Sequence, residues 1–149
     1  MSDENSAKAE KKNLFWPKLD DEASALDAAK AGFVGGGLLT AGLILPLVSY
    51  STSGDPLVHD YETQVTFYLS QGLQLAVAGF LTWRVWRAKG RFASILLLIW
   101  LLGEVRLKLA TGQMNVGWMI MWFFAALSLV NSVRGHWRLH GIRRGRPAA

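Results

Sequence analysis

The chain of 149 residues contains no cysteine. This absence excludes disulfide bonds, thiol nucleophiles, thiolate metal sites and iron–sulfur clusters, although it does not indicate a compartment. The signatures of common enzymes are also missing, because the sequence has no Gly-x-Ser-x-Gly, no His-Glu-x-x-His and no phosphate-binding Gly-Lys-Ser/Thr loop. We therefore expect a protein that is not an enzyme, has no catalytic residues and binds no cofactor.

Histidine is scarce as well. His59 lies in a polar stretch between two apolar runs, whereas His136 and His140 lie in a basic stretch near the C-terminus. His136 and His140 are four residues apart and would share one face of a helix. Because no third ligand accompanies them, the sequence predicts neither a metal site nor a haem site.

The most prominent feature is apolar sequence, which makes up 51% of the chain. A helix needs about 20 apolar residues to cross the hydrocarbon of a bilayer, and four stretches approach this length. They are residues 31–50, 63–83, 92–110 and 116–133. The sequence therefore predicts an all-α membrane protein, a four-helix bundle of two antiparallel transmembrane hairpins.

This membrane domain is expected to occupy residues 20–134. Residues 1–19 would form a cytoplasmic tail whose Trp16-Pro17 end lies at the membrane interface. Residues 135–149 would form a basic cytoplasmic tail. Gly135, Gly141 and Pro147 argue against a long continuation of the last helix into this tail.

The positions of the positive charges predict the orientation. Of the sixteen Lys and Arg residues, five precede the first apolar stretch, four lie in the segment 83–91 and five follow Val133. Only Arg106 and Lys108 fall on the other side. The positive-inside rule then places both termini in the cytoplasm, and we expect a multi-pass membrane protein.

The net charge of +5 could also indicate a nucleic-acid partner. The cations flank apolar stretches, however, instead of lining a groove or alternating with stacking aromatics. We expect them to meet lipid and not nucleic acid. The predicted headgroup contacts are Arg84, Arg87, Lys89, Arg91, Arg134 and Arg138.

Small residues recur along the first apolar stretch. Ala28, Gly32, Gly36 and Thr40 are spaced by four and form one stripe of a helix. Such a stripe allows another backbone to approach closely, which is a main source of helix association in lipid. The stripe could serve an oligomer or partner interface, or it could pack within the same bundle.

Four polar residues within apolar stretches are candidate functional groups: Gln71, Gln74, Glu104 and Lys108. Gln71 and Gln74 share a helix face and could form hydrogen bonds across the bundle or line a polar site. Glu104 and Lys108 are four residues apart and can meet. They could form a proton- or ion-coupled site, or a self-neutralised pair near the outer interface.

The segment Asn131-Ser132-Val133-Arg134-Gly135, followed by Trp137 and His140, resembles the end of a family of small four-helix inner-membrane proteins of bacteria. Trp16-Pro17 and the acidic, alanine-rich start of the first span are similar to the beginning of that family. The resemblance implies a four-span topology in the bacterial inner membrane, and it implies no biochemical activity.

Together these features predict a small non-catalytic accessory or scaffold subunit that acts through helix–helix contacts. Its partners would be the lipid bilayer and other membrane proteins, or further copies of itself in a homo-oligomer. The alternative is an oligomeric small transporter or channel in which Gln71, Gln74 and Glu104 are the polar intramembrane groups. An enzyme acting on a lipid or quinone has no residue constellation to support it.

Overall fold

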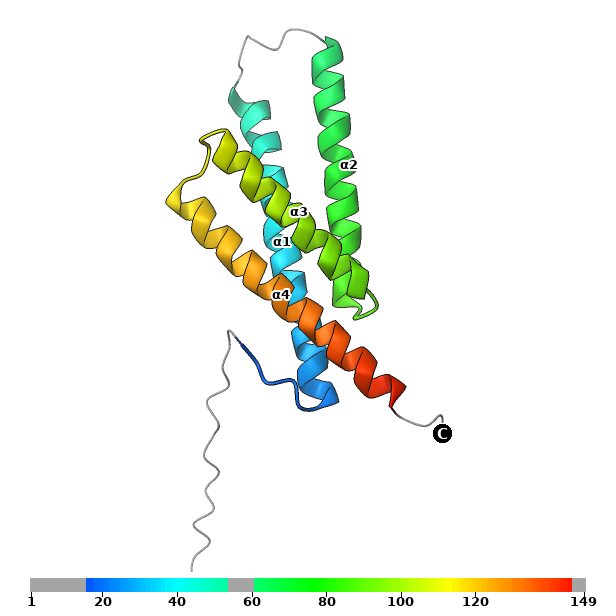
Figure 1. The fold of residues 1–149 in the computed structure, drawn as a ribbon. Helices are drawn as coiled ribbons and strands as arrows, with labels where there is room; N and C mark the ends of the chain where they lie inside the picture. Colours follow the sequence, from blue (N-terminus) through cyan, green and yellow to red (C-terminus); the bar gives the residue numbers. More distant parts are fainter. Residues whose placement is uncertain (1–15, 54–60, 146–149) are drawn as a thin grey trace, which may run out of the picture.

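The computed structural model describes residues 16–53 and 61–145, and within these ranges the regular structure is entirely α-helical. The four helices follow one another along the chain (Figure 1). They are α1 (Glu22–Ser53), α2 (Tyr61–Trp86), α3 (Arg91–Ala110) and α4 (Val116–Arg144). The predicted all-α, four-helix architecture is thus confirmed at this level.

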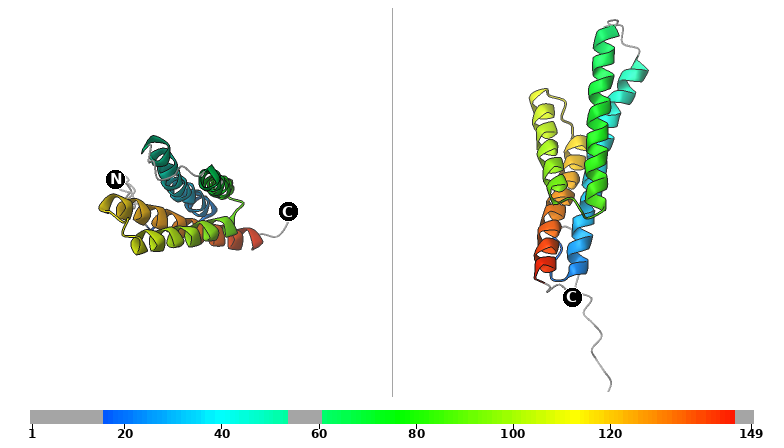
Figure 2. Two further views of the ribbon diagram at one scale, coloured as in Figure 1. Left: turned by 90° about the horizontal axis from the view of Figure 1, so that it is seen from above. Right: turned by 90° about the vertical axis from the view of Figure 1, so that its right-hand side faces the viewer.

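The helices form two layers, α1 beside α2 and α3 beside α4 (Figure 2). The most extensive packing joins α1 to α4, the next joins α1 to α2, and α1 barely touches α3. Helices α2 and α3 meet at the turn that connects them and diverge away from it. Helix α1 is therefore the element around which the bundle is assembled.

Local sequence explains where two of the helices begin. Before α1, the Asp21 carboxylate accepts a hydrogen bond from the Ser24 backbone N–H at 2.7 Å. Before α4, the Asn115 side chain accepts one from the Trp118 N–H at 3.0 Å. Both contacts satisfy backbone donors that the first turn of a helix leaves without partners.

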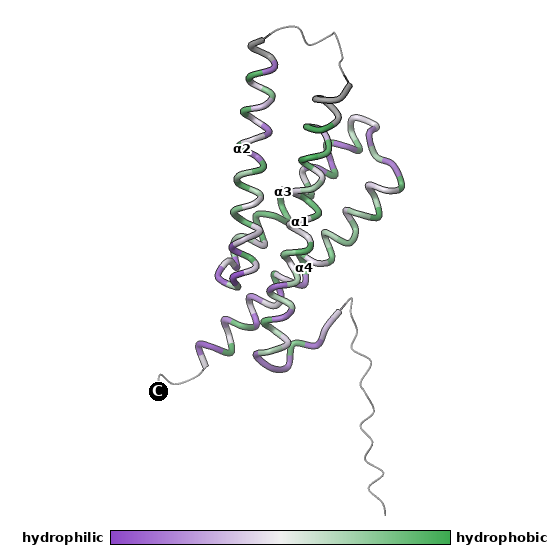
Figure 3. The backbone as a smooth tube through the Cα atoms, turned by 180° about the vertical axis from the view of Figure 1, so that it is seen from behind, coloured by the Kyte–Doolittle hydropathy of each residue, from purple (hydrophilic) through white to green (hydrophobic). Residues whose placement is uncertain are grey.

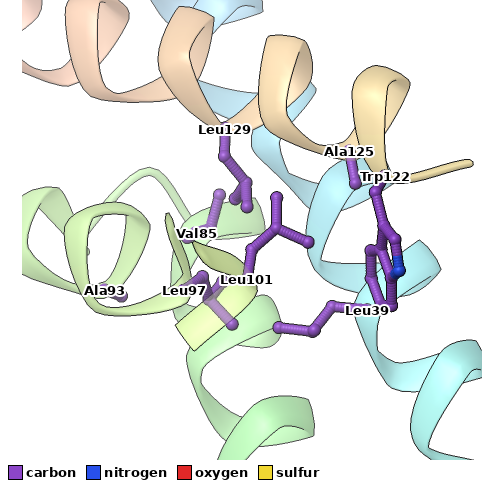
Figure 4. Close-up of a cluster of buried hydrophobic side chains, with 8 residues drawn as sticks. All are labelled: Leu39, Val85, Ala93, Leu97, Leu101, Trp122, Ala125 and Leu129. Atoms are coloured by element: carbon purple, nitrogen blue, oxygen red, sulfur yellow. The ribbon is translucent and has the colours of Figure 1, made fainter. Parts of the chain in front are cut away.

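The apolar core lies where the two layers meet (Figure 4). It contains one buried residue from α1, one from α2 and three each from α3 and α4. These residues are Leu39, Val85, Ala93, Leu97, Leu101, Trp122, Ala125 and Leu129. The Trp122 ring stacks on Trp118 with the ring centroids 5.5 Å apart.

Glycines allow α1 and α4 to approach each other closely. A Cβ atom at Gly135 of α4 would lie against the backbone of Ala25 and Ala29, and one at Gly35 of α1 would lie 2.6 Å from the Ala125 carbonyl oxygen. Only glycine fits where two backbones come this near. The two helices are therefore held by backbone proximity on both sides of their crossing.

Helix α4 is longer than the sequence suggested. Gly135 and Gly141 were expected to argue against a long extension, yet the helix continues to Arg144. Gly135 does not interrupt the helix, because α1 packs directly on it. The residues beyond 134 therefore form the last turns of a bundle helix up to Arg144.

Two helices are long and apolar enough to cross a membrane, Glu22–Val48 within α1 and Val116–Arg144. Only 33% and 28% of their most apolar windows are buried, which is far less than expected for core helices of a water-soluble protein. By the same criteria of length and apolar composition, α2 and α3 are not candidate spans. The four predicted spans thus reduce to two that length and composition support.

The outer surfaces of all four helices are apolar. Large side chains that are more than half exposed include Val34 on α1, Leu69 on α2, Ile99 on α3 and Phe123 on α4. Hydrophilic segments gather at the α2–α3 turn, the α3–α4 loop and the last turns of α4, and further ones alternate with hydrophobic segments along the part of α2 away from its turn (Figure 3). This distribution is the reverse of that on a water-soluble bundle.

Candidate functional sites

The last turns of α4 bind the segment that precedes α1. The Arg138 Nε–H donates to the Leu19 carbonyl oxygen at 3.1 Å, and the Arg143 Nε lies 3.1 Å from Glu22 Oε1. The Arg134 guanidinium lies over the Trp16 ring, 3.7 Å from its centroid. Two of the predicted headgroup residues, Arg134 and Arg138, therefore contact the chain itself.

The other predicted headgroup residues surround the α2–α3 turn. Three of their guanidinium groups lie over aromatic rings, with Arg84 over Phe80, Arg87 over Trp83 and Arg91 over Phe92. Stacking of this kind keeps the aromatic body apolar while the charge stays at its edge. Arg84 and Arg87 are exposed, as a headgroup contact requires.

The α2–α3 turn is tightly fixed. Ala88 adopts a left-handed conformation with φ of 50°, which is uncommon for a residue with a side chain. A Cβ atom at Gly90 would lie 2.9 Å from the Ala93 Cβ and 3.2 Å from the Arg84 backbone. Lys89 lies between Ala88 and Gly90, so these constraints also fix the position of its backbone, near the end of α4.

A buried polar cluster lies next to the core, toward the C-terminal end of α4. It consists of Ser94 from α3 with Ser132 and His136 from α4. The Ser132 hydroxyl donates to the Ala29 carbonyl oxygen of α1 at 2.6 Å, and Ser94 Oγ lies 2.9 Å from Ser132 Oγ. Ser94 and Ser132 are completely buried, and His136 is 4% exposed. The cluster therefore links α1, α3 and α4.

The hydrogen bonds determine the tautomer of His136. Its Nδ1 lies 2.9 Å from the Ser132 carbonyl oxygen, which can only accept, so Nδ1 carries the proton. In the neutral ring, Nε2 is then an acceptor. No described residue donates to it, and the same holds for Nε2 of His140, one turn further along α4.

Both histidines line a pocket of about 380 Å³ between the α2–α3 turn and the end of α4. Its wall consists of Ala88, Lys89, Arg91, His136, Leu139, His140 and Arg143. Three of these residues are permanently cationic and none is acidic. The arrangement favours an anion over a metal cation, and the described residues contain no group of three potential metal ligands.

Both histidines lie beyond the apolar part of α4 that ends at Val133, and both are biased toward the neutral form. Burial lowers the pKa of His136, and the hydrogen bond to the Ser132 backbone only partly offsets this. Desolvation, followed by the charges of Arg144 and Arg91, lowers the pKa of His140. Both histidines are therefore mostly neutral at pH 7, and Nε2 of His136 is an acceptor.

The polar candidates within the apolar stretches do not converge. Gln71 and Gln74 are both half-buried, and Gln71 Oε1 has no hydrogen-bond partner among the described residues. Glu104 instead accepts a hydrogen bond from Trp100 Nε1 at 3.4 Å. Since α2 and α3 diverge away from their turn, these groups do not come together within one chain.

Glu104 and Lys108 also fail to meet. The Lys108 ammonium lies 4.4 Å from the centroid of the Trp118 ring on α4. No ion pair joins the two side chains within the residues that the structure describes. Each side chain contacts a tryptophan instead of the other member of the predicted pair.

The predicted stripe of small residues lies inside the chain's own contacts. Gly32 packs against Ser132 of α4 and Val85 of α2, and Gly36 packs against Thr82 of α2. Ala28 is buried, and the Thr40 hydroxyl donates to the Gly36 carbonyl oxygen at 2.8 Å. In the structure this stripe packs within the bundle, which is the second of the two alternatives.

A different row of small residues is open. On α2, a Cβ atom at Gly72 or Gly79 would meet nothing within 4 Å. Ala76 lies between them, and helical spacing places all three on one exposed face. Leu69 and Leu73, exposed by 69% and 67%, flank this face. We call Leu69, Gly72, Leu73, Ala76 and Gly79 the outer α2 face.

Comparisons with models of known protein families, with curated proteins and with solved structures gave no match. The resemblance of the Asn131–Gly135 segment to small inner-membrane proteins is thus not accompanied by a family assignment. Function has to be argued from the geometry alone.

The sequence did not predict the Ser94–Ser132–His136 cluster. Ser132, His136 and His140 are spaced by four, and this spacing was a readable sign of a polar helix face. Ser94 lies 38 residues before Ser132 and is brought to it only by the packing of α3 on α4.

Proposed function

We propose that this chain is a small non-catalytic integral membrane protein that acts as an accessory or scaffold subunit. The observation that carries the proposal is the apolar outer surface of all four helices. Lipid covers such a surface in a membrane, and a partner helix can replace lipid wherever small residues permit close packing.

The proposed placement has all four helices in the bilayer of the bacterial inner membrane, as two antiparallel hairpins with both termini in the cytoplasm. Support comes from the cationic α2–α3 turn and from the basic end of α4, which binds the N-terminal segment. The α3–α4 loop would then face the other side of the membrane.

The natural absence of cysteine makes this placement directly testable. Single cysteines introduced as Gln113→Cys in the α3–α4 loop and Gly145→Cys after α4 are treated with a membrane-impermeant maleimide. We expect labelling of position 113 in intact spheroplasts and of position 145 only after permeabilisation. The reverse pattern, or labelling of both positions from outside, would overturn the placement.

The partner site in this proposal is the outer α2 face, with a transmembrane helix of a second copy or of another protein as its occupant. Gly72 and Ala76 are four residues apart and form the small-xxx-small pair that close helix packing requires. The face lies on the side of α2 opposite Ala78 and Thr82, which pack inside the bundle.

Cross-linking in native membranes tests this site. Gly72→Cys, expressed at its natural level, is treated with a short bis-maleimide, and Phe123→Cys on the outer surface of α4 is the matched control. We expect one adduct of defined mass from position 72 and none from position 123. The adduct's mass distinguishes a second copy from a different chain.

Two results would contradict the scaffold function. One is a monomer with no adduct at position 72. The other is equal adduct formation at both positions, which would indicate random collision in the membrane.

A further inference from the structure

The pocket between the α2–α3 turn and the end of α4 contains a combination of groups that the scaffold function does not use. Two histidine nitrogens, Nε2 of His136 and Nε2 of His140, have no partner among the described residues. Both histidines line the pocket together with Lys89, Arg91 and Arg143. Its location is independent of the outer α2 face.

His136 is the most informative of these residues, because it is 4% exposed and cannot obtain a partner simply by facing solvent. Its Nδ1 edge is bound to the Ser132 carbonyl oxygen, which leaves the opposite edge of the ring with Nε2. A buried acceptor without a donor destabilises the folded chain. A ligand that supplies a donor would remove that destabilisation.

The charges define the rest of the ligand. Arg143 is paired with Glu22, whereas no described residue forms an ion pair with Lys89 or Arg91. The pocket therefore has an excess of positive charge on the side opposite the histidines' helix. A metal ion would be repelled by these charges, and an anion would be attracted.

The ligand must therefore offer both oxygen acceptors for the cations and a hydroxyl donor for Nε2 of His136. A phosphate group accompanied by a hydroxyl meets both requirements. Sulfate has the acceptors but not the donor. This difference separates specific recognition in the pocket from attraction to positive charge in general.

We propose that Lys89, Arg91, His136 and His140 form a binding site for a phosphate group that carries, or lies beside, a hydroxyl. Two sources have this chemistry, namely free hydrogen phosphate and a lipid headgroup such as that of phosphatidylglycerol. A second groove of about 410 Å³, between α2 and α3, shares Lys89 and Arg91 and is lined by Phe80, Phe92 and Leu96. For a lipid, this groove would receive an acyl chain.

The first arm of the test measures binding of inorganic phosphate and of sulfate by calorimetry, at pH 7.5 and equal ionic strength, with the full chain in neutral-lipid nanodiscs. We expect phosphate to bind at least about threefold more tightly than sulfate, as one additional hydrogen bond implies. Equal affinities would overturn the donor role of the ligand.

The second arm compares two variants that remove the same charge from the same turn. Lys89→Gln alters the pocket wall, whereas Arg87→Gln alters an exposed residue outside it. Loss of a charged hydrogen bond predicts affinity about tenfold lower or more for Lys89→Gln and little change for Arg87→Gln. Equal losses would mean that the turn attracts anions without a defined site.

His140→Gln tests the histidine side without altering the buried cluster. The variant should have the same thermal midpoint as the unchanged chain in the absence of phosphate, and its preference for phosphate over sulfate should fall. An unchanged preference in a correctly folded variant would overturn the role proposed for His140.

The third arm identifies the source. Nanodiscs of phosphatidylcholine are compared with nanodiscs that also contain phosphatidylglycerol. If the lipid occupies the site, added phosphatidylglycerol weakens the apparent binding of inorganic phosphate; if the site serves free phosphate, the lipid has no effect. Absence of phosphate binding in phosphatidylcholine nanodiscs would overturn the proposal, whatever the cross-linking at position 72 shows.

Discussion

Glycine has opposite roles in the α1–α4 contact and on the outer α2 face. At the α1–α4 contact, glycines allow two backbones to pack closely beside the buried Ser94–Ser132–His136 cluster. On the outer α2 face, Gly72 and Gly79 have open space. A glycine therefore indicates that a close approach is possible, and the surrounding fold decides whether the approach occurs within the chain or is left for a partner.

Polar groups differ between the two regions as well. Ser132 is completely buried and bonded to α1 and α3, whereas Gln71 of α2 has a carbonyl oxygen without a described partner. In an apolar environment, a polar group with hydrogen-bond partners fixes the register of the packed helices, whereas one without partners destabilises the folded state. The α1–α4 region is accordingly the part of the molecule that we expect to be most rigid.

The largest expected effect comes from adding a side chain to the α1–α4 crossing. Gly135→Leu would force a side chain into the backbone of Ala25 and Ala29, where no rotamer can relieve the overlap. We expect more than about 3 kcal/mol of destabilisation, because overpacking against side chains alone costs about 1–3 kcal/mol. Equilibrium unfolding in mixed detergent micelles measures it.

Two controls accompany this substitution. Gly141→Leu on the same helix and Gly72→Leu on the outer α2 face both enter open space and should leave the stability of the isolated chain nearly unchanged. If all three variants unfold at the same denaturant concentration, the contrast between the two regions is wrong.

A smaller effect is expected from the buried cluster. Ser132→Ala removes the donor to the Ala29 carbonyl oxygen and the partner of Ser94, and it should cost about 1–3 kcal/mol. Ser70→Ala on α2 removes only an exposed hydrogen bond within its own helix, to Phe67, and should change little. Equal effects of the two substitutions on the unfolding midpoint would show that the cluster does not link the helices.

The smallest effect is a dependence of stability on pH. Because burial lowers the pKa of His136, and burial with nearby arginines lowers that of His140, the unfolded chain binds more protons than the folded chain below about pH 7. Stability is then fully present above the ordinary histidine pKa of about 6.5 and is lost as the pH falls.

For the proton taken up by the buried His136, the loss approaches at most about 1.4 kcal/mol per pH unit. Unfolding titrations between neutral and mildly acidic pH measure it. His136→Asn should reduce this slope, because the asparagine amide can still donate to the Ser132 carbonyl oxygen but does not titrate. A slope that is unchanged in this variant would assign the pH dependence to other groups.

Apolar content and charge placement determined the coarse features of this protein. Four long apolar stretches predicted four helices because helix formation depends on local composition and length. The cationic residues 83–91 predicted a polar turn, which the structure has between α2 and α3. Intrinsic chemistry of this kind is readable from a single sequence, since it does not depend on which helix meets which.

Only the tertiary structure decided which of the small and polar residues work together. The stripe at Gly32 and Gly36 faces the chain's own α2 and α4, and Glu104 and Lys108 each contact a tryptophan instead of one another. Ser94 and His136 meet across 42 residues of sequence. Such contacts follow from how the layers pack, and packing depends on all four helices at once, whereas helix formation depends on each stretch alone.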